Sequence, residues 1–113
     1  MAPPRLKTKL WVQAQLRLCD QRNISAVVLR KGDEDAGAVL VKLDRRDLGC
    51  TVYTQIRTSE GEAAWLAGTG KTPVTSAEAD AYIARQVGRD WDLWVLEIDD
   101  REGRLPEMTV VEG

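Results

Sequence analysis

Two short segments are apolar at consecutive positions, and they restrict the fold more than any other feature of the sequence. The run from Ala36 to Leu43 reads AGAVLVKL, and the run from Trp91 to Ile98 reads WDLWVLEI. Successive side chains of a β-strand point to opposite faces of the sheet. A strand that is apolar on both sides therefore needs cover on both faces. We expect the 91–98 segment to be a central strand.

The remaining segments predict further strands and two helices. Strands are expected at 24–30, 50–58 and 63–67, with a short edge strand at 108–111. Because the polar turn KGDED joins 24–30 to 36–43, we expect these two strands to form a β-hairpin. Helices are expected at 7–22 and 76–87. The order α-β-β-β-(β)-α-β predicts an α+β fold, with two helices on a mainly antiparallel sheet of four to five strands.

The ends of the second helix carry specific signals. Thr75 and Glu78 have the spacing of a capping box, in which the two side chains bond to free amide groups of the first turn. Gly88 stands where a left-handed residue commonly ends a helix. The length of 113 residues predicts a single domain over 1–113, with flexible ends at about 1–5 and 105–113.

The first helix has an apolar surface that is wider than one sheet face needs. Its apolar side chains flank a narrow polar stripe on both sides: Leu10, Trp11, Ala14 and Leu18 on one, and Val12, Leu16 and Cys19 on the other. This width predicts a second packing partner besides the sheet, either the other helix or another chain. We therefore predict a possible homodimer, with an interface at Trp11, Val12, Leu16 and Trp91.

Charge and hydropathy exclude several classes of partner. The net charge is -2, so the chain would not attract polyanions, and no nucleic-acid partner is predicted. No apolar run approaches the roughly 20 residues that cross a bilayer, so no membrane contact is predicted. The first residues lack the apolar region of a signal peptide, and we expect a cytoplasmic protein.

The chain has no histidine and only two cysteines, which removes several chemistries. A zinc site built from Cys and His lacks ligands, and nucleophiles that depend on an imidazole base are impossible. Cys19 and Cys50 are expected to be small core residues. We predict no catalytic residue, no metal and no cofactor, so the inventory argues against an enzyme.

The segment LAGTGKTPV, from Leu66 to Val74, has the residue types of a phosphate-binding loop without its spacing. The motif G-x-x-x-x-G-K-[ST] needs a glycine where this chain has Trp65. Pro73 also separates the Lys-Thr pair from the helix start near Thr75. We therefore expect no ATP site here.

Four charged residues form a hypothetical small-ligand or metal site. Arg30 and Lys31 flank the first turn and could grip a carboxylate or phosphate, and Asp92 and Glu97 come from the predicted last strand. Glu97 and Asp99 would lie on one face of the last strand and could share a hard cation, or paired carboxylates there could flank a glycosidic bond. The alternative is a surface turn and a polar strand end whose charges balance.

Four tryptophans and no phenylalanine supply the large aromatic side chains, besides two tyrosines. Trp11 and Trp94 are expected to fill the core between helix and sheet. Trp65 and Trp91 lie at the ends of predicted elements, where partial exposure would let them anchor a partner.

Three features together resemble a bacterial family of short proteins known as domain-of-unknown-function family 1491. They are the Arg30-Lys31-Gly32 turn, the Ala36-Gly37-Ala38 strand start and the Asp-x-Asp-Leu-Trp-Val-x-Glu run from Asp90 to Glu97. The similarity extends from Arg5 to about Arg104, and Trp91 replaces the proline of the family pattern. The resemblance implies a soluble α+β protein and supplies no activity.

The sequence therefore predicts a non-enzymatic protein-interaction or self-associating module. The alternative is a small-ligand or metal-binding protein that uses the charged residues of the first turn and the last strand.

Overall fold

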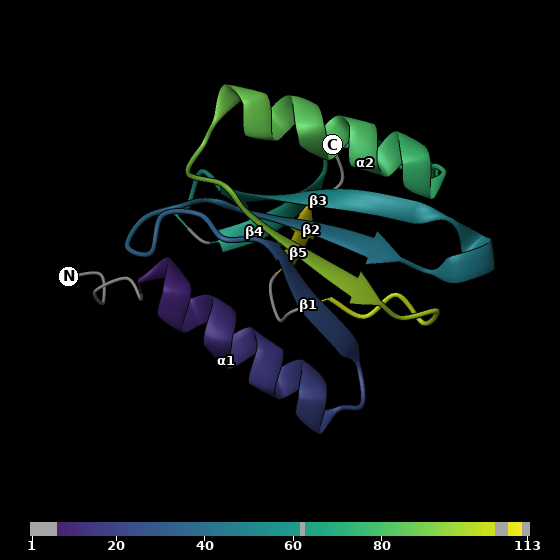
Figure 1. Ribbon diagram of the computed structural model, residues 1–113, viewed down its shortest axis with the longest axis horizontal. Coiled ribbons are helices and arrows are strands. Elements are labelled where there is room, and N and C mark those ends of the chain that lie inside the picture. Colours follow the sequence, from purple (N-terminus) through teal and green to yellow (C-terminus); the bar gives the residue numbers. More distant parts are fainter. Residues whose placement is uncertain (1–6, 62, 106–108, 112–113) are drawn as a thin grey trace.

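The computed structural model describes residues 7–61, 63–105 and 109–111, and in them a mixed sheet carries one helix on each face (Figure 1). The helices are α1 (Thr8–Gln21) and α2 (Ser76–Arg89). The strands are β1 (Ser25–Arg30), β2 (Val39–Asp44), β3 (Cys50–Arg57), β4 (Ala63–Ala67), β5 (Trp94–Asp99) and β6 (Thr109–Val111). A short 3-10 helix, η1 (Arg46–Leu48), connects β2 to β3. Residues 1–5, and most of 105–113, where flexible ends were predicted, lie outside the described residues.

The strand order is β1-β5-β2-β3-β4-β6, which confirms the α+β prediction and corrects one part of it. β1 and β2 do not form the predicted hairpin, because β5 lies between them, antiparallel to β1 and parallel to β2. The parallel pairs make the sheet mixed. The hairpin prediction was wrong because turn composition reports only on neighbours in sequence, while β5 has two apolar faces and takes the interior position between β1 and β2.

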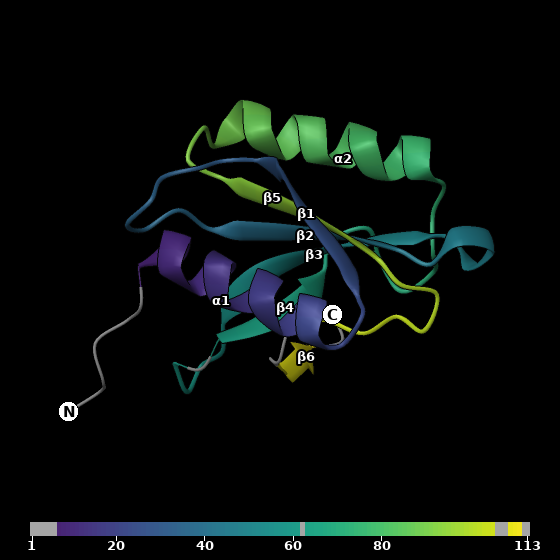
Figure 2. The ribbon, with the colours of Figure 1, turned by 60° about the horizontal axis from the view of Figure 1, so that its bottom comes forward.

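Both faces of the sheet are covered, as the consecutive apolar residues predicted. Figure 2 shows α2 and α1 on opposite sides of the sheet. In β5, Trp94, Leu96 and Ile98 pack in the core on the α1 side, and Val95 packs in the core on the α2 side. Burial of these side chains from water supplies the main stabilisation of the fold.

Two local predictions were wrong for reasons that the structure makes plain. Helix α2 continues through Gly88 to Arg89, and the Asp90 amide closes it by donating to the carbonyl of Gln86 at 3.0 Å. Trp65 is fully buried rather than partly exposed, because its side chain packs in the core between the sheet and α1. Its ring packs against Trp11, with a centroid distance of 6.0 Å.

The turn after β5 depends on a buried carboxylate, and this gives a testable prediction. Asp100 is 7% exposed and accepts bonds from the Arg104 backbone amide at 2.8 Å and the Arg104 Nε at 2.9 Å. These Arg104 bonds hold the pKa of Asp100 below its ordinary value. We expect Asp100→Asn to lower the free energy of unfolding at neutral pH by about 1–2 kcal/mol, because a neutral amide accepts weaker bonds.

The pH dependence gives this prediction its sign. A depressed carboxyl pKa stabilises the fold above the unfolded value and loses that effect as pH falls through the folded value. Urea titrations between about pH 2 and pH 7 should therefore show that the free energy of unfolding falls less with decreasing pH for Asp100→Asn than for the natural chain. An equally steep decline would exclude this role for Asp100.

Candidate functional site

The free edge of the sheet at β1 is the candidate functional site. β1 is the outermost strand on this side, and β5 is its neighbour. Three consecutive apolar residues of β1 are exposed: Val27 by 50%, Val28 by 38% and Leu29 by 51%. Helix α2 packs over β2 and β3, and so leaves the α2 face of β1 open. Such an edge offers unpaired main-chain groups next to apolar side chains.

A bulge ends the regular part of this strand. Val28 is paired with Leu96, and Arg30 is paired with Val95, so Leu29 is the extra residue. Bulges re-aim side chains at sheet edges. Arg30 beyond the bulge donates to the Leu93 carbonyl at 2.7 Å and lies 5.5 Å from the ring centroid of Trp91. Trp91, 76% exposed as its position predicted, thus stands beside this end of β1.

The loop that follows β1 packs its backbone against the turn before β5. The Asp33 amide donates to the Asp92 carbonyl at 3.0 Å, and the Trp94 Nε1 donates to the Asp33 carbonyl at 2.7 Å. A Cβ added at Gly32 or Gly37 would lie 2.2 or 2.3 Å from the Asp92 carbonyl oxygen. Glycine at these two positions lets the loop backbone come close to the Asp92 carbonyl, which any side chain there would prevent.

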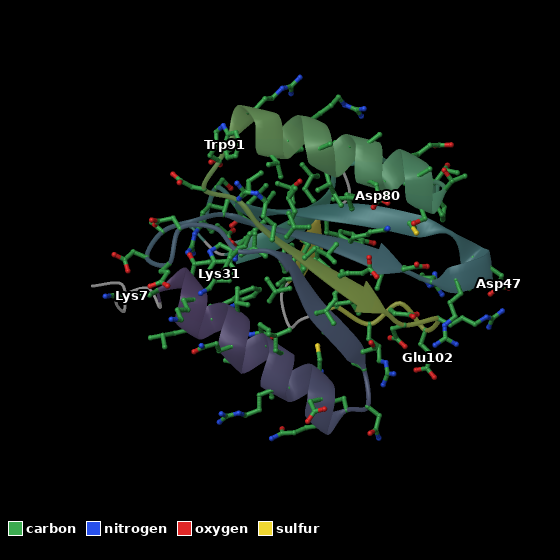
Figure 3. All side chains as sticks on the ribbon, viewed as in Figure 1. Lys7, Lys31, Asp47, Asp80, Trp91 and Glu102 are labelled. Atoms are coloured by element: carbon green, nitrogen blue, oxygen red, sulfur yellow. The ribbon has the colours of Figure 1, made fainter. Side chains whose placement is uncertain are left out.

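The structure divides the four predicted ligand residues between two places. Arg30 ends β1, and Asp92 lies in the turn before β5. Lys31 is exposed, and its Nζ lies 3.9 Å from Glu34 Oε1. Lys31 and Trp91 are directed toward the same end of the sheet, away from Asp47 and Glu102 (Figure 3). Glu97 instead lies 3.6 Å from Lys42, its register partner in β2. The four residues therefore do not line one cleft.

Lys42 forms a polar cluster between the sheet and α2 that sequence reasoning missed. It is 3% exposed, and its Nζ donates to Ser76 Oγ at 2.7 Å and to Asp80 Oδ1 at 2.8 Å. Burial works against the charge, but the bond to Asp80 and the charges of Asp80 and Glu97 outweigh it and raise the pKa of Lys42. A lysine inside the apolar run VLVKL was the available signal.

Lys42 does not offer Ser76 a neutral amine that could act as its general base. A general base must be unprotonated near the working pH, and the raised pKa keeps Lys42 as an ammonium ion. Its contacts fasten α2 to the sheet. We assign the cluster a structural role.

The predicted interface residues of α1 lie mostly inside the protein. Val12 is 1% exposed and belongs to the core between α1 and the sheet, so a second chain cannot reach it. Trp11 and Leu16 pack partly buried against the same core. The buried side of α1 centres on Val12 because the helix lies along the sheet. Of the predicted set, Trp91 is the residue that is largely exposed.

The loop resembling a phosphate site leads directly into the start of α2, next to a hollow in the surface. Helix α2 begins at Ser76, and the Thr75 hydroxyl accepts from the Glu78 amide at 3.1 Å, as the capping signal predicted. A hollow of about 590 Å³ lies between η1 and this helix start. Within the described residues, no group of three or more His, Cys, Asp and Glu could hold a metal ion.

Both cysteines lie in the core of the protein. Cys19 and Cys50 are free and buried, as expected of core residues, and burial raises the pKa of both thiols. Over the ranges that the structure covers, no helix has the length and apolar character to cross a membrane.

Comparisons with known proteins identify the family of the chain and solved structures that are similar to it. Residues 6–106 match the family model described as "Protein of unknown function (DUF1491)". A crystal structure of a DUF1491 family protein from Caulobacter crescentus CB15 is similar with TM-score 0.83 and 38% identity, covering 95% of this chain and 100% of that one. An NMR structure of a DUF1491 family protein from that organism has TM-score 0.82 and 37% identity, covering 96% and 99%.

A third solved structure is more distant in sequence. The solution structure of a protein from A. tumefaciens has TM-score 0.78 and 28% identity, covering 97% of this chain and 98% of that one. No curated protein matches the sequence.

Proposed function

Because the chain belongs to the DUF1491 family, which is described as having unknown function, we propose a function from the geometry of its own sheet edge. The protein is a non-enzymatic interaction module, and it binds an extended apolar strand alongside β1. In this binding mode, main-chain hydrogen bonds supply affinity and alternate side chains supply specificity.

One observation carries the proposal: β1 is an outer strand with three consecutive exposed apolar residues. Sheet edges are usually protected by charges, prolines or bulges. From Ile24 to Leu29 the chain contains no charged residue and no proline, and the bulge affects only the last part of the strand. An edge left open in this way is suited to another strand.

Trp91 extends this surface beyond the end of β1. Large aromatic side chains commonly anchor protein interfaces, because they bury much apolar area while losing little conformational entropy. The cation–π contact with Arg30 restricts the exposed ring before a partner arrives. The ligand-site alternative has less support, because Glu97 lies in the separate Lys42 cluster.

Selection of displayed random peptides on the immobilised protein tests this proposal. We expect the recovered peptides to be rich in apolar residues and to bind at least about tenfold more weakly to Val27→Lys, because a charge would enter the paired edge. Leu48→Lys is the matched control, since Leu48 is an apolar residue of comparable exposure, 41%, on η1 rather than on β1. Equal binding to both variants, or no recovered peptide, would refute the β1 proposal.

A further inference from the structure

We propose that the strand that pairs with β1 is the β1 of a second copy of this chain. This inference rests on the proposed β1 surface and names its occupant. The two strands run antiparallel, and the two-fold axis passes midway between the Val27 residues of the two copies, a position called here the axis through Val27. The two six-stranded sheets then join into one continuous sheet. Isologous pairing of this kind is the commonest way in which identical chains form dimers.

The side-chain pattern of β1 is complementary to itself. Ala26 and Val28 are paired with Ile98 and Leu96, which face the α1 core, whereas Val27 is paired with Glu97 on the α2 face. A two-fold axis perpendicular to the sheet keeps each face continuous, so opposed residues must share a face. An axis through Val27 sets Val27 against Val27 of the second copy and Ala26 against its Val28.

The bulge selects this register over the neighbouring one. The ladder is regular from Ser25 to Val28 and shifts at Leu29. An axis through Val27 places the regular stretches opposite each other and leaves each Leu29 beside Ser25 of the other copy. An axis through Val28 would bring both bulges into the centre of the ladder, where they would disrupt its hydrogen bonds.

Charge favours the antiparallel direction. Arg30 and Lys31 close one end of β1, while Ser25 at the other end is paired with Asp99. Parallel pairing would set Arg30 and Lys31 of the two copies side by side, whereas antiparallel pairing places these basic residues at opposite ends of the ladder. Opposite charges across strands favour pairing, and like charges oppose it.

Light scattering coupled to size exclusion gives the first test. We expect the full chain to run as a dimer at high micromolar concentration and Val27→Lys to raise the dissociation constant at least about tenfold. Leu48→Lys should leave the dimer unchanged. Val27 is half exposed, so its replacement should preserve the far-UV circular dichroism spectrum. A monomer for the natural chain, or equal dimerisation of Val27→Lys, would overturn the inference.

Cross-linking gives a second test that also reads the register. Directly opposed side chains have Cβ atoms about 5 Å apart, close enough for a disulfide after small adjustment, whereas diagonal neighbours are about 7–8 Å apart. We expect Val27→Cys to form a covalent dimer under mild oxidation, and Val28→Cys and Leu48→Cys to stay monomeric. The native cysteines are 6% and 2% exposed and should not react. A cross-link through Val28→Cys alone would overturn the proposed register.

The outcomes separate this inference from the proposed function. If the natural chain is monomeric but selected peptides bind at β1, self-pairing is wrong and the β1 surface stands. If neither a second copy nor a peptide pairs with β1, both proposals are wrong.

Discussion

Gly37→Ala is expected to lower the free energy of unfolding by about 3 kcal/mol, the upper end of what overpacking a well-packed site costs. The added Cβ would lie 2.3 Å from the Asp92 carbonyl oxygen and 2.9 Å from the Asp33 carbonyl oxygen. Both are backbone atoms, so neither can move away by a side-chain rotation. Relief would require the 31–38 loop to separate from the turn before β5, which would break the Asp33–Asp92 hydrogen bond.

Gly88→Ala is the matched control, because the same substitution meets open space there. No atom lies within 4 Å of a Cβ built on Gly88, which stands inside α2. Alanine favours a helix over glycine by up to about 1 kcal/mol, less near a helix end, so this variant should be slightly stabilised. Urea denaturation of the two variants should give opposite signs. Similar stabilities would show that the loop accommodates a side chain at Gly37.

Lys42→Ala is expected to lower the free energy of unfolding by about 2–3 kcal/mol. Removing one partner of a fully buried ion pair costs about 3–5 kcal/mol, and we expect less here because Asp80 is 60% exposed and stays hydrated. The substitution also removes the buried stem and leaves Glu97 without its partner in β2. Lys42→Met keeps an apolar stem of similar length, so its loss should be smaller, about 1 kcal/mol.

The dependence of the free energy of unfolding on alkaline pH distinguishes the contribution of the Lys42 charge from that of its packing. The folded-state pKa of Lys42 is raised, so its contribution is complete below the unfolded value and disappears as pH rises through the folded value. The natural chain should therefore lose stability above about pH 10 more steeply than Lys42→Met. Parallel curves between pH 8 and pH 11 would show that the charge of Lys42 does not stabilise the fold.

The sequence alone predicted most elements, because their signals are local. The capping pair Thr75 and Glu78 located the start of α2, and the consecutive apolar residues of 91–98 identified a strand with two buried faces. The resemblance to the family rested on residues whose role the structure explains. Gly32 and Gly37 are needed where the backbone approaches Asp92.

The pairing of strands and the candidate site could not be predicted in the same way. The hairpin signal between β1 and β2 was local, and the insertion of β5 between them is a long-range event. The exposure of Val27, Val28 and Leu29 follows from that insertion, since it leaves β1 at the edge. In the sequence these three apolar residues cannot be distinguished from residues of a buried strand.

What the sequence determined by itself was the set of helices and strands and the need for cover on both faces of the central strands. Periodicity and capping depend on residues within a few positions of each other, so one chain contains that information. Only the tertiary structure decided which strand stands at the edge, that Val12 lies inside the core, and that Lys42 meets Ser76, Asp80 and Glu97. These contacts join residues far apart in the chain, and they form because burying the two faces of β5 outweighs the local preference for a hairpin.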